Sequence, residues 1–155
     1  MEYEKIWKKV LSSDEQIKYE FSIGKKYRTF CEILGCLAGV IILFTPGYYV
    51  GILIIIASIL YFNYFLKISN AYAFTNKRVV LYRGWIASEL ISIDYNKITD
   101  VVVEQKILGS LTNSGNLIIN TAGGGFSDSK QDQKIWSIEN PYEVKKKMDE
   151  IRSGL

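Results

Sequence analysis

The longest apolar stretch of the chain runs from Ile33 to Leu66, 34 residues without Asp, Glu, Lys or Arg. Thr45-Pro46-Gly47 interrupts it near the middle, and Pro-Gly is a strong turn signal. A bilayer core is about 30 Å thick and takes roughly 20 apolar residues per helix. The pattern therefore predicts a hairpin of two transmembrane helices, from about Tyr27 to Thr45 and from Tyr48 to Leu66. Two helices buried in a soluble core are the alternative.

Basic residues flank the expected hairpin, and the connecting turn carries no charge. Short loops rich in Lys and Arg stay on the cytoplasmic side of a membrane. We therefore expect a multi-pass protein of the cell membrane with both termini in the cytoplasm. The candidate membrane-surface anchors are Lys25, Lys26, Arg28 and Lys67.

Two glycines of the first span, Gly35 and Gly39, have the G-x-x-x-G spacing that lets helix backbones approach closely. They are candidate helix-packing positions, either between the two spans of one hairpin, which is favoured, or in a dimer. Glu32 is a charged residue inside the first span. We expect it to pair with Arg28 or to reach the membrane surface, with a transport or proton-relay role as the alternative.

From Ala71 onward the chain changes to short β-rich runs separated by turn residues. Their length and spacing predict an antiparallel sheet or a partly open barrel. The expected strands are Tyr72–Phe74, Val79–Tyr82, Glu89–Asp94, Ile98–Gln105, Asn116–Thr121 and Gln133–Ile138. Before the hairpin, Gln16–Ile23 alternates polar and apolar residues with the period of a strand. An isolated strand is unstable, so we expect this one to pair with the later sheet.

Both ends of the chain are predicted to form amphipathic helices. The first is short, Glu4–Leu11. The second begins where Asn140 fits the N-cap, Pro141 the first helical position and Glu143 the acidic position of a capping box. On the face that would close the sheet lie Val144, Met148 and Ile151. The expected regions are an N-terminal cytoplasmic segment (1–26), the transmembrane hairpin (27–67) and a β-rich domain (71–155).

Composition narrows the chemistry. With 19 basic against 16 acidic residues, the net charge of +3 is too weak to favour nucleic acid as a partner. The chain has no His, which removes the commonest general base and metal ligand, so we expect no enzymatic activity, no metal and no cofactor. Cys31 and Cys36 face different directions of a helix and are expected to fill apolar space. The glycine-rich Ala122–Gly125 lacks the Lys-Ser/Thr pair of a phosphate-binding loop, which favours a simple turn.

Several sequence blocks follow the expected hairpin in order: Phe74–Gly84, Ile98–Gln105, Leu108-Gly109, Gly115–Gly124 and Ile138–Pro141. This string resembles the bacterial pleckstrin-homology-like (bacterial PH domain) family of small membrane proteins, whose members typically carry two transmembrane spans just ahead of it. The resemblance covers roughly Ala71 to Ile151, plus the hairpin by architecture. One departure is Ser110–Ser114, which lacks the aromatic residue and second glycine often found there.

The resemblance implies an α+β membrane protein, in which a transmembrane helical hairpin is joined to a pleckstrin-homology fold. That fold is an antiparallel β-sandwich, or partly open barrel, of two near-orthogonal sheets capped by a C-terminal helix. Six strands after the hairpin and one before it would make the usual seven. The family supplies no established catalytic residues and no common ligand.

The expected function is a membrane-anchored binding or scaffolding module at the cytoplasmic face, acting through the bilayer and through protein partners or self-association. One alternative is a module that binds anionic lipid headgroups. Its candidate contacts are Lys77, Arg78 and Arg83, although turn cations commonly serve only solvation. Another alternative is a small accessory factor of a membrane complex in envelope stress, export or toxin resistance.

Overall fold

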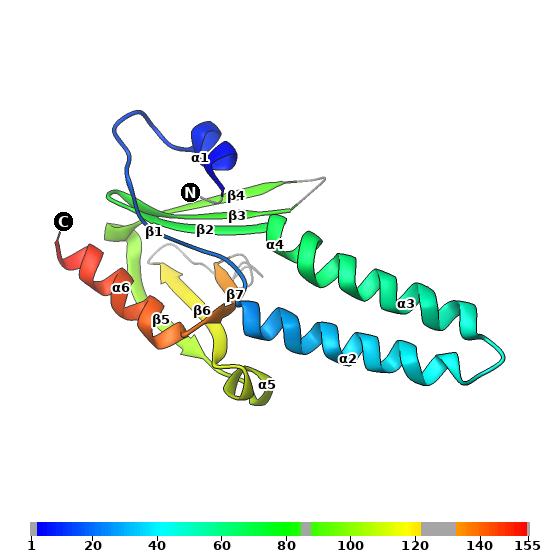
Figure 1. The fold of residues 1–155 in the computed structure, drawn as a ribbon. Coiled ribbons are helices and arrows are strands. Elements are labelled where there is room, and N and C mark those ends of the chain that lie inside the picture. The colour runs from blue at the N-terminus through cyan, green and yellow to red at the C-terminus, as the bar shows by residue number, and fades with distance from the viewer. Residues whose placement is uncertain (1–2, 85–87, 122–132, 155) are drawn as a thin grey trace.

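Two antiparallel sheets carry a long helical hairpin that projects away from them (Figure 1). The structure is a computed structural model and describes residues 3–84, 88–121 and 133–154. The strands are β1 (Ile17–Phe21), β2 (Asn70–Thr75), β3 (Arg78–Arg83), β4 (Glu89–Asp94), β5 (Ile98–Glu104), β6 (Ser114–Thr121) and β7 (Lys134–Glu139). The helices are α1 (Glu4–Val10), α2 (Lys25–Leu43), α3 (Tyr48–Leu60), α4 (Leu66–Ile68), α5 (Ile107–Leu111) and α6 (Pro141–Ser153), with a π-helical turn η1 (Tyr61–Phe65) and a 3₁₀ turn η2 (Tyr95–Lys97).

The first sheet has the order β1-β2-β3-β4, so the strand before the hairpin pairs with the strand after it. In the β1–β2 register Tyr19 faces Phe74, and Phe21 faces Tyr72. The ring of Phe21 also meets that of Phe74 edge-on, with centroids 4.9 Å apart. Such cross-strand aromatic contacts stabilise a sheet. The predicted pairing is confirmed, and the hairpin is inserted between two adjacent strands of one sheet.

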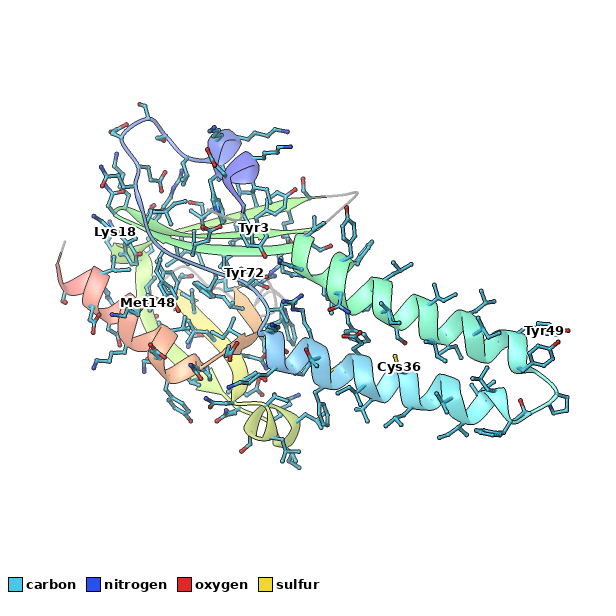
Figure 2. The ribbon with its side chains drawn as sticks, in the orientation of Figure 1. Tyr3, Lys18, Cys36, Tyr49, Tyr72 and Met148 are labelled. Carbon is cyan, nitrogen blue, oxygen red and sulfur yellow. The ribbon has the colours of Figure 1, made fainter. Side chains whose placement is uncertain are left out.

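The core lies between the first sheet, the second sheet (β5-β6-β7) and α6. Leu81 from the first sheet and Leu117 and Ile135 from the second are fully buried there. Val144 and Met148 of α6 are buried against the same cluster, and Ile151 packs at its edge (Figure 2). The predicted apolar face of the C-terminal helix is confirmed.

Asn140 at the N-cap and Pro141 at the start of α6 are confirmed, but the expected capping box does not form. Asn140 adopts the left-handed region (φ 48°, ψ 60°) and makes no side-chain hydrogen bond to the helix backbone. Its amide nitrogen donates instead to Glu143 Oε2 at 3.3 Å, and its backbone N–H donates to the Asn113 carbonyl at 2.9 Å. Asn tolerates the left-handed region better than most residues, so Asn140 serves as the sharp corner between β7 and α6.

Helix α1 covers the outer face of the first sheet (Figure 1). Trp7 is buried on the small side chains of Ala71 and Ala73, which leave room for the indole. The indole nitrogen donates to Glu20 Oε1 at 3.1 Å, so the polar end of the ring keeps a partner. The predicted N-terminal amphipathic helix is confirmed, and because it covers the outer face while the main core covers the inner one, both faces of β2 are buried.

The hairpin leaves most of its large apolar side chains in open space (Figure 2). Tyr49 marks the end remote from the sheets. Each of the following side chains is at least two fifths exposed: Ile33, Leu34, Leu37, Val40, Ile41, Phe44, Tyr48, Tyr49, Val50, Ile52, Leu53, Ile56, Ile59, Leu60, Tyr61 and Tyr64. The alternative of two helices buried in the chain's own core is therefore wrong for this structure.

Within the described ranges, one helical stretch is long and apolar enough to cross a membrane by length and composition, Tyr48–Ile68. It runs through α3, η1 and α4, and only 6% of its most apolar window is buried inside the structure. Helix α2 has 19 residues, but its first eight include Lys25, Lys26, Arg28 and Glu32. Of the two expected spans, the second alone meets the criterion.

Candidate functional site

The two hairpin helices touch backbone to backbone through glycines. A Cβ atom on Gly51 would lie 2.6 Å from the Gly39 carbonyl oxygen, and one on Gly39 would lie 2.6 Å from Ile55 Cγ1. A Cβ on Gly35 would overlap Ser58 Oγ. The structure thus places Gly35 and Gly39 at the contact between α2 and α3, which is the within-hairpin arrangement favoured by the sequence.

Of the two expectations for Glu32, the ion pair with Arg28 is absent from the described residues and the contact with the membrane surface stays a prediction. Within the part of the chain that the structure describes, no ion pair joins Arg28 to Glu32, and the Glu32 side chain makes no hydrogen bond. Arg28 Nη1 donates to the Phe62 carbonyl at 3.4 Å, in the π-helical turn η1. Arg28 thus contacts the neighbouring helix at the turn where its regular α-helical hydrogen bonding is interrupted.

Three of the four candidate anchors meet at one place. Lys25, Arg28 and Lys67 line a cavity of about 280 Å³ between the end of β1, the base of the hairpin and the start of α6. Glu139 also lines this cavity, and the fourth anchor, Lys26, lies 3.4 Å from Glu139 Oε1. Arg28 Nε is buried and makes no hydrogen bond within the described residues. We call this space the basal cavity.

The candidate headgroup contacts Lys77, Arg78 and Arg83 do not come together. In the β2–β3 register Asn70 pairs with Arg83 and Phe74 with Val79, so Arg83 lies at the hairpin end of the sheet and the Lys77-Arg78 turn at the opposite end. Arg83 Nη2 donates to the Lys134 carbonyl. The three side chains therefore form no shared headgroup pocket.

Arg78 belongs to a buried ion pair instead. Its Nε and Nη2 donate to the two carboxylate oxygens of Glu15 at 2.9 and 2.8 Å. The Glu15 side chain is 1% exposed, and Thr75 Oγ1 donates to it at 2.8 Å. Hydrogen bonding from the guanidinium holds the pKa of Glu15 below its usual value against the opposing effect of burial. Lys77 pairs with the exposed Asp14 at 2.8 Å.

One surface element was not expected from the sequence. Helix α5 (Ile107–Leu111) forms where a loop was predicted, and its large side chains Ile107, Leu108 and Leu111 are exposed. Their spacing of one and four residues is a weak helical signal, which the surrounding Gly, Ser and Asn residues obscure. Sequence analysis named none of these three residues as a candidate site.

The family model for the bacterial PH domain matches residues 22–153, more than four fifths of the chain and including the hairpin. The chain belongs to the bacterial PH domain family. This PH domain is also similar to two solved structures. One is a DUF1696-family protein with a pleckstrin-homology domain from Shewanella loihica PV-4, at 12% identity and a TM-score of 0.50, covering 97% of this chain and 94% of that one. The other is a pleckstrin homology domain from Shewanella amazonensis SB2B, at 11% identity and a TM-score of 0.51, covering 99% and 97%.

At such identities the two solved structures support the fold alone: an α+β pleckstrin-homology-like fold with antiparallel sheets and a C-terminal helix. No protein of curated function matches the chain. The predicted resemblance to the bacterial PH domain family is confirmed, and the pleckstrin-homology fold generally serves as a binding or scaffolding module. The predicted turn at Ala122–Gly125 lies outside the described residues. Among the described residues no group of three His, Cys, Asp or Glu side chains is placed to hold a metal.

Proposed function

We propose that this PH domain is a binding or scaffolding module that the hairpin holds at the cytoplasmic face of the cell membrane. The observation that carries the proposal is the exposed apolar surface on both hairpin helices. Monomeric soluble proteins rarely expose contiguous apolar patches larger than a few hundred Å². Lipid is a solvent in which such a surface is stable, and helices satisfy their own backbone hydrogen bonds there.

The pairing of β1 with β2 supports insertion of both hairpin helices into the membrane together. Strands β1 and β2 are hydrogen-bonded neighbours, so the chain enters α2 and returns from α4 on the same side of the β-domain. If the Tyr48–Ile68 stretch inserts, the antiparallel α2 packed on it must insert as well. The charged first turns of α2 then lie at headgroup level, with both termini on the cytoplasmic side.

The proposed task is recognition rather than catalysis. The chain contains no His, and the charged side chains of Arg78 and Glu15 form an ion pair with each other. We propose protein partners or further copies of this chain as the ligands of the module, with no role for nucleic acid, metal or cofactor. An accessory role in a larger membrane complex is one form of this proposal.

Membrane extraction tests the anchor. The full-length chain, expressed in bacteria, should stay in the membrane pellet after an alkaline carbonate wash and enter solution only with detergent. Leu53→Arg with Ile56→Arg should release it, because each Arg near a helix centre costs about 2.5–3.5 kcal/mol of insertion free energy. The matched control, Leu90→Arg with Val102→Arg, changes exposed apolar residues of the sheets and should leave the chain in the pellet.

A different outcome would overturn the anchor. If the chain is found without detergent as a defined assembly in the high-speed supernatant, the exposed hairpin faces are covered by other copies rather than by lipid. The scaffolding role would then be one of self-assembly away from the bilayer.

The basal cavity favours a second function, binding of an anionic phosphate headgroup. Lys25, Arg28 and Lys67 line one space at the base of the hairpin, which under the proposed anchor is the level of the lipid headgroups. Guanidinium and ammonium groups are the usual partners of phosphate. The volume of about 280 Å³ suits one phosphate group rather than a large headgroup. The proposed contacts thus differ from the three candidates on the β2–β3 hairpin.

Native mass spectrometry from mild detergent tests the headgroup site. The chain should retain phosphatidylglycerol in preference to phosphatidylcholine. Lys25→Gln with Lys67→Gln should weaken retention roughly tenfold or more, since each basic residue near an anionic surface contributes about 1 kcal/mol. Lys77→Gln with Lys97→Gln removes two cations elsewhere and should change nothing. Competition by inorganic phosphate would identify a free-anion site, and equal retention of both lipids would exclude the headgroup site.

A further inference from the structure

Helix α5 presents three large apolar side chains to solvent. Ile107 is 84% exposed, Leu111 72% and Leu108 46%. They lie on a five-residue helix between β5 and β6, outside the hairpin. None of the three belongs to either hydrophobic core of the β-domain.

The helix is held firmly in place, so this exposure is not that of a loose loop. Gln105 Nε2 donates to the Ser114 carbonyl at 3.1 Å and to the Gly109 carbonyl at 3.4 Å. The hydroxyls of Thr112 and Ser114 are hydrogen-bonded at 2.6 Å and both residues are buried. Gly109 is buried, and a Cβ there would overlap the Ser114 carbonyl oxygen. The Gly109 side of α5 is thus fixed to β6, while its large apolar side chains face outward.

The position of α5 relates it to the hairpin. Tyr27, in the first turn of α2, lines one open cavity of about 630 Å³ together with Ile107, Leu108 and Trp136. Figure 1 shows α5 beside this first turn, at the end of the β-domain from which the hairpin projects. Lys106 lines the same cavity at the N-terminal end of α5. Tyr, Trp and Lys beside apolar side chains are the composition of a membrane-interface contact.

We propose that α5 inserts Ile107, Leu108 and Leu111 into the headgroup and acyl-chain boundary of the leaflet through which the hairpin enters. This inference rests on the proposed membrane anchor. We assign the bilayer as the partner of this apolar surface because α5 lies beside the first turn of the hairpin. Lipid that surrounds the hairpin would therefore also contact α5, and no further partner is needed. A short apolar element inserted shallowly gives the domain a second contact with the bilayer, which restrains its tilting relative to the membrane. The domain is then held in one orientation on the membrane.

Depth-dependent fluorescence quenching tests the inference. In a background of Cys31→Ala and Cys36→Ala, the single changes Leu111→Cys, Leu53→Cys and Lys77→Cys each receive an environment-sensitive fluorophore. The labelled full-length chains are reconstituted in nanodiscs of phosphatidylcholine and phosphatidylglycerol that contain spin-labelled lipid, with the spin label shallow in one set and in the middle of the acyl chain in another. We expect loss of fluorescence at the Leu111 and Leu53 positions, and none at Lys77, which lies at the far end of the first sheet.

The label at Leu53 separates failure of the α5 insertion from failure of the membrane anchor. Quenching at Leu53 without quenching at Leu111 would overturn the insertion of α5 and leave the anchor standing. No quenching at Leu53 would overturn the anchor itself, and with it this inference. A blue-shifted but unquenched label at Leu111 would mean that protein covers α5, which also overturns the inference. Because Leu111 is largely exposed, its replacement is not expected to disturb folding.

Discussion

Replacing Arg78 by alanine should lower the free energy of unfolding by about 3 kcal/mol, because it leaves the buried carboxylate of Glu15 without its cation. The substitution removes both hydrogen bonds to that carboxylate and one to the Val10 carbonyl, which ties the end of α1 to the sheet. The value is at the lower end for a broken buried pair, since the Arg78 side chain is 25% exposed. Thermal unfolding of the full-length chain in detergent, followed by circular dichroism, measures it.

The effect of Arg78→Ala should depend on pH. In the folded wild type the pKa of Glu15 is lowered, so the pair stabilises above the unfolded pKa of about 4.3 and its contribution is lost as pH falls through the lower folded pKa. In the variant the buried carboxylate has lost its cation, and burial favours the protonated form. Acidification therefore reduces the cost of the unpaired carboxylate in the variant, while it removes the stabilising contribution of the ion pair in the wild type. The stability difference should narrow below about pH 5.

Lys77→Ala is the matched control for Arg78→Ala. Lys77 is the next residue in the same turn, and its partner Asp14 is exposed, so solvent screens the pair. The unfolding midpoint should stay close to that of the wild type at every pH. Equal losses for the two variants would show that Arg78 and Glu15 contribute no more than a surface pair.

Local patterns predicted most of the β-domain because its strands are short runs of β-favouring residues separated by turn residues. The bounds of β4 agree with the predicted Glu89–Asp94, and β1 joins the sheet as its alternation required. Helix α5 was missed because it depends on tertiary contacts: Gln105 bridges to Ser114, and Gly109 packs on the same residue. These contacts override a composition rich in Gly, Ser and Asn that indicates a loop.

The candidate site was predicted less well, since pairing partners are distant in sequence. The basic turn at Lys77 and Arg78 is consistent with a headgroup site when read alone. Its acidic partners Asp14 and Glu15 lie 63 residues earlier, and only the β1–β2 pairing brings them near. By contrast, the basic residues at the ends of the hairpin, Lys25, Arg28 and Lys67, lie together at its base, and their role as membrane-surface anchors stays a prediction. That they line one cavity follows from the folded strands and could not be read from the sequence.

Alanine at Gly51 should loosen the hairpin more than alanine at any other hairpin glycine. The new Cβ would meet the Gly39 carbonyl oxygen at 2.6 Å and the Leu43 backbone nitrogen at 3.0 Å. Backbone atoms cannot rotate away, so α2 and α3 must separate, at a cost of about 1–3 kcal/mol for an overpacked contact. Gly39→Ala meets the Ile55 side chain first and should cost less. Gly35→Ala meets the small Ser58 side chain, which can change rotamer, and should cost least of the three.

Gly47→Ala is the control for this series, since the nearest atom to its Cβ would be Thr45 Oγ1 at 3.6 Å, an ordinary contact. Thermal unfolding in detergent should rank the variants Gly51, Gly39, Gly35 and Gly47 from most to least destabilised. The same samples decide between the two meanings of the G-x-x-x-G spacing. If the glycines pack within one hairpin, the loss of stability in each variant should not depend on protein concentration. Losses that disappear on dilution would instead assign Gly35 and Gly39 to an interface between copies, because only an association responds to mass action.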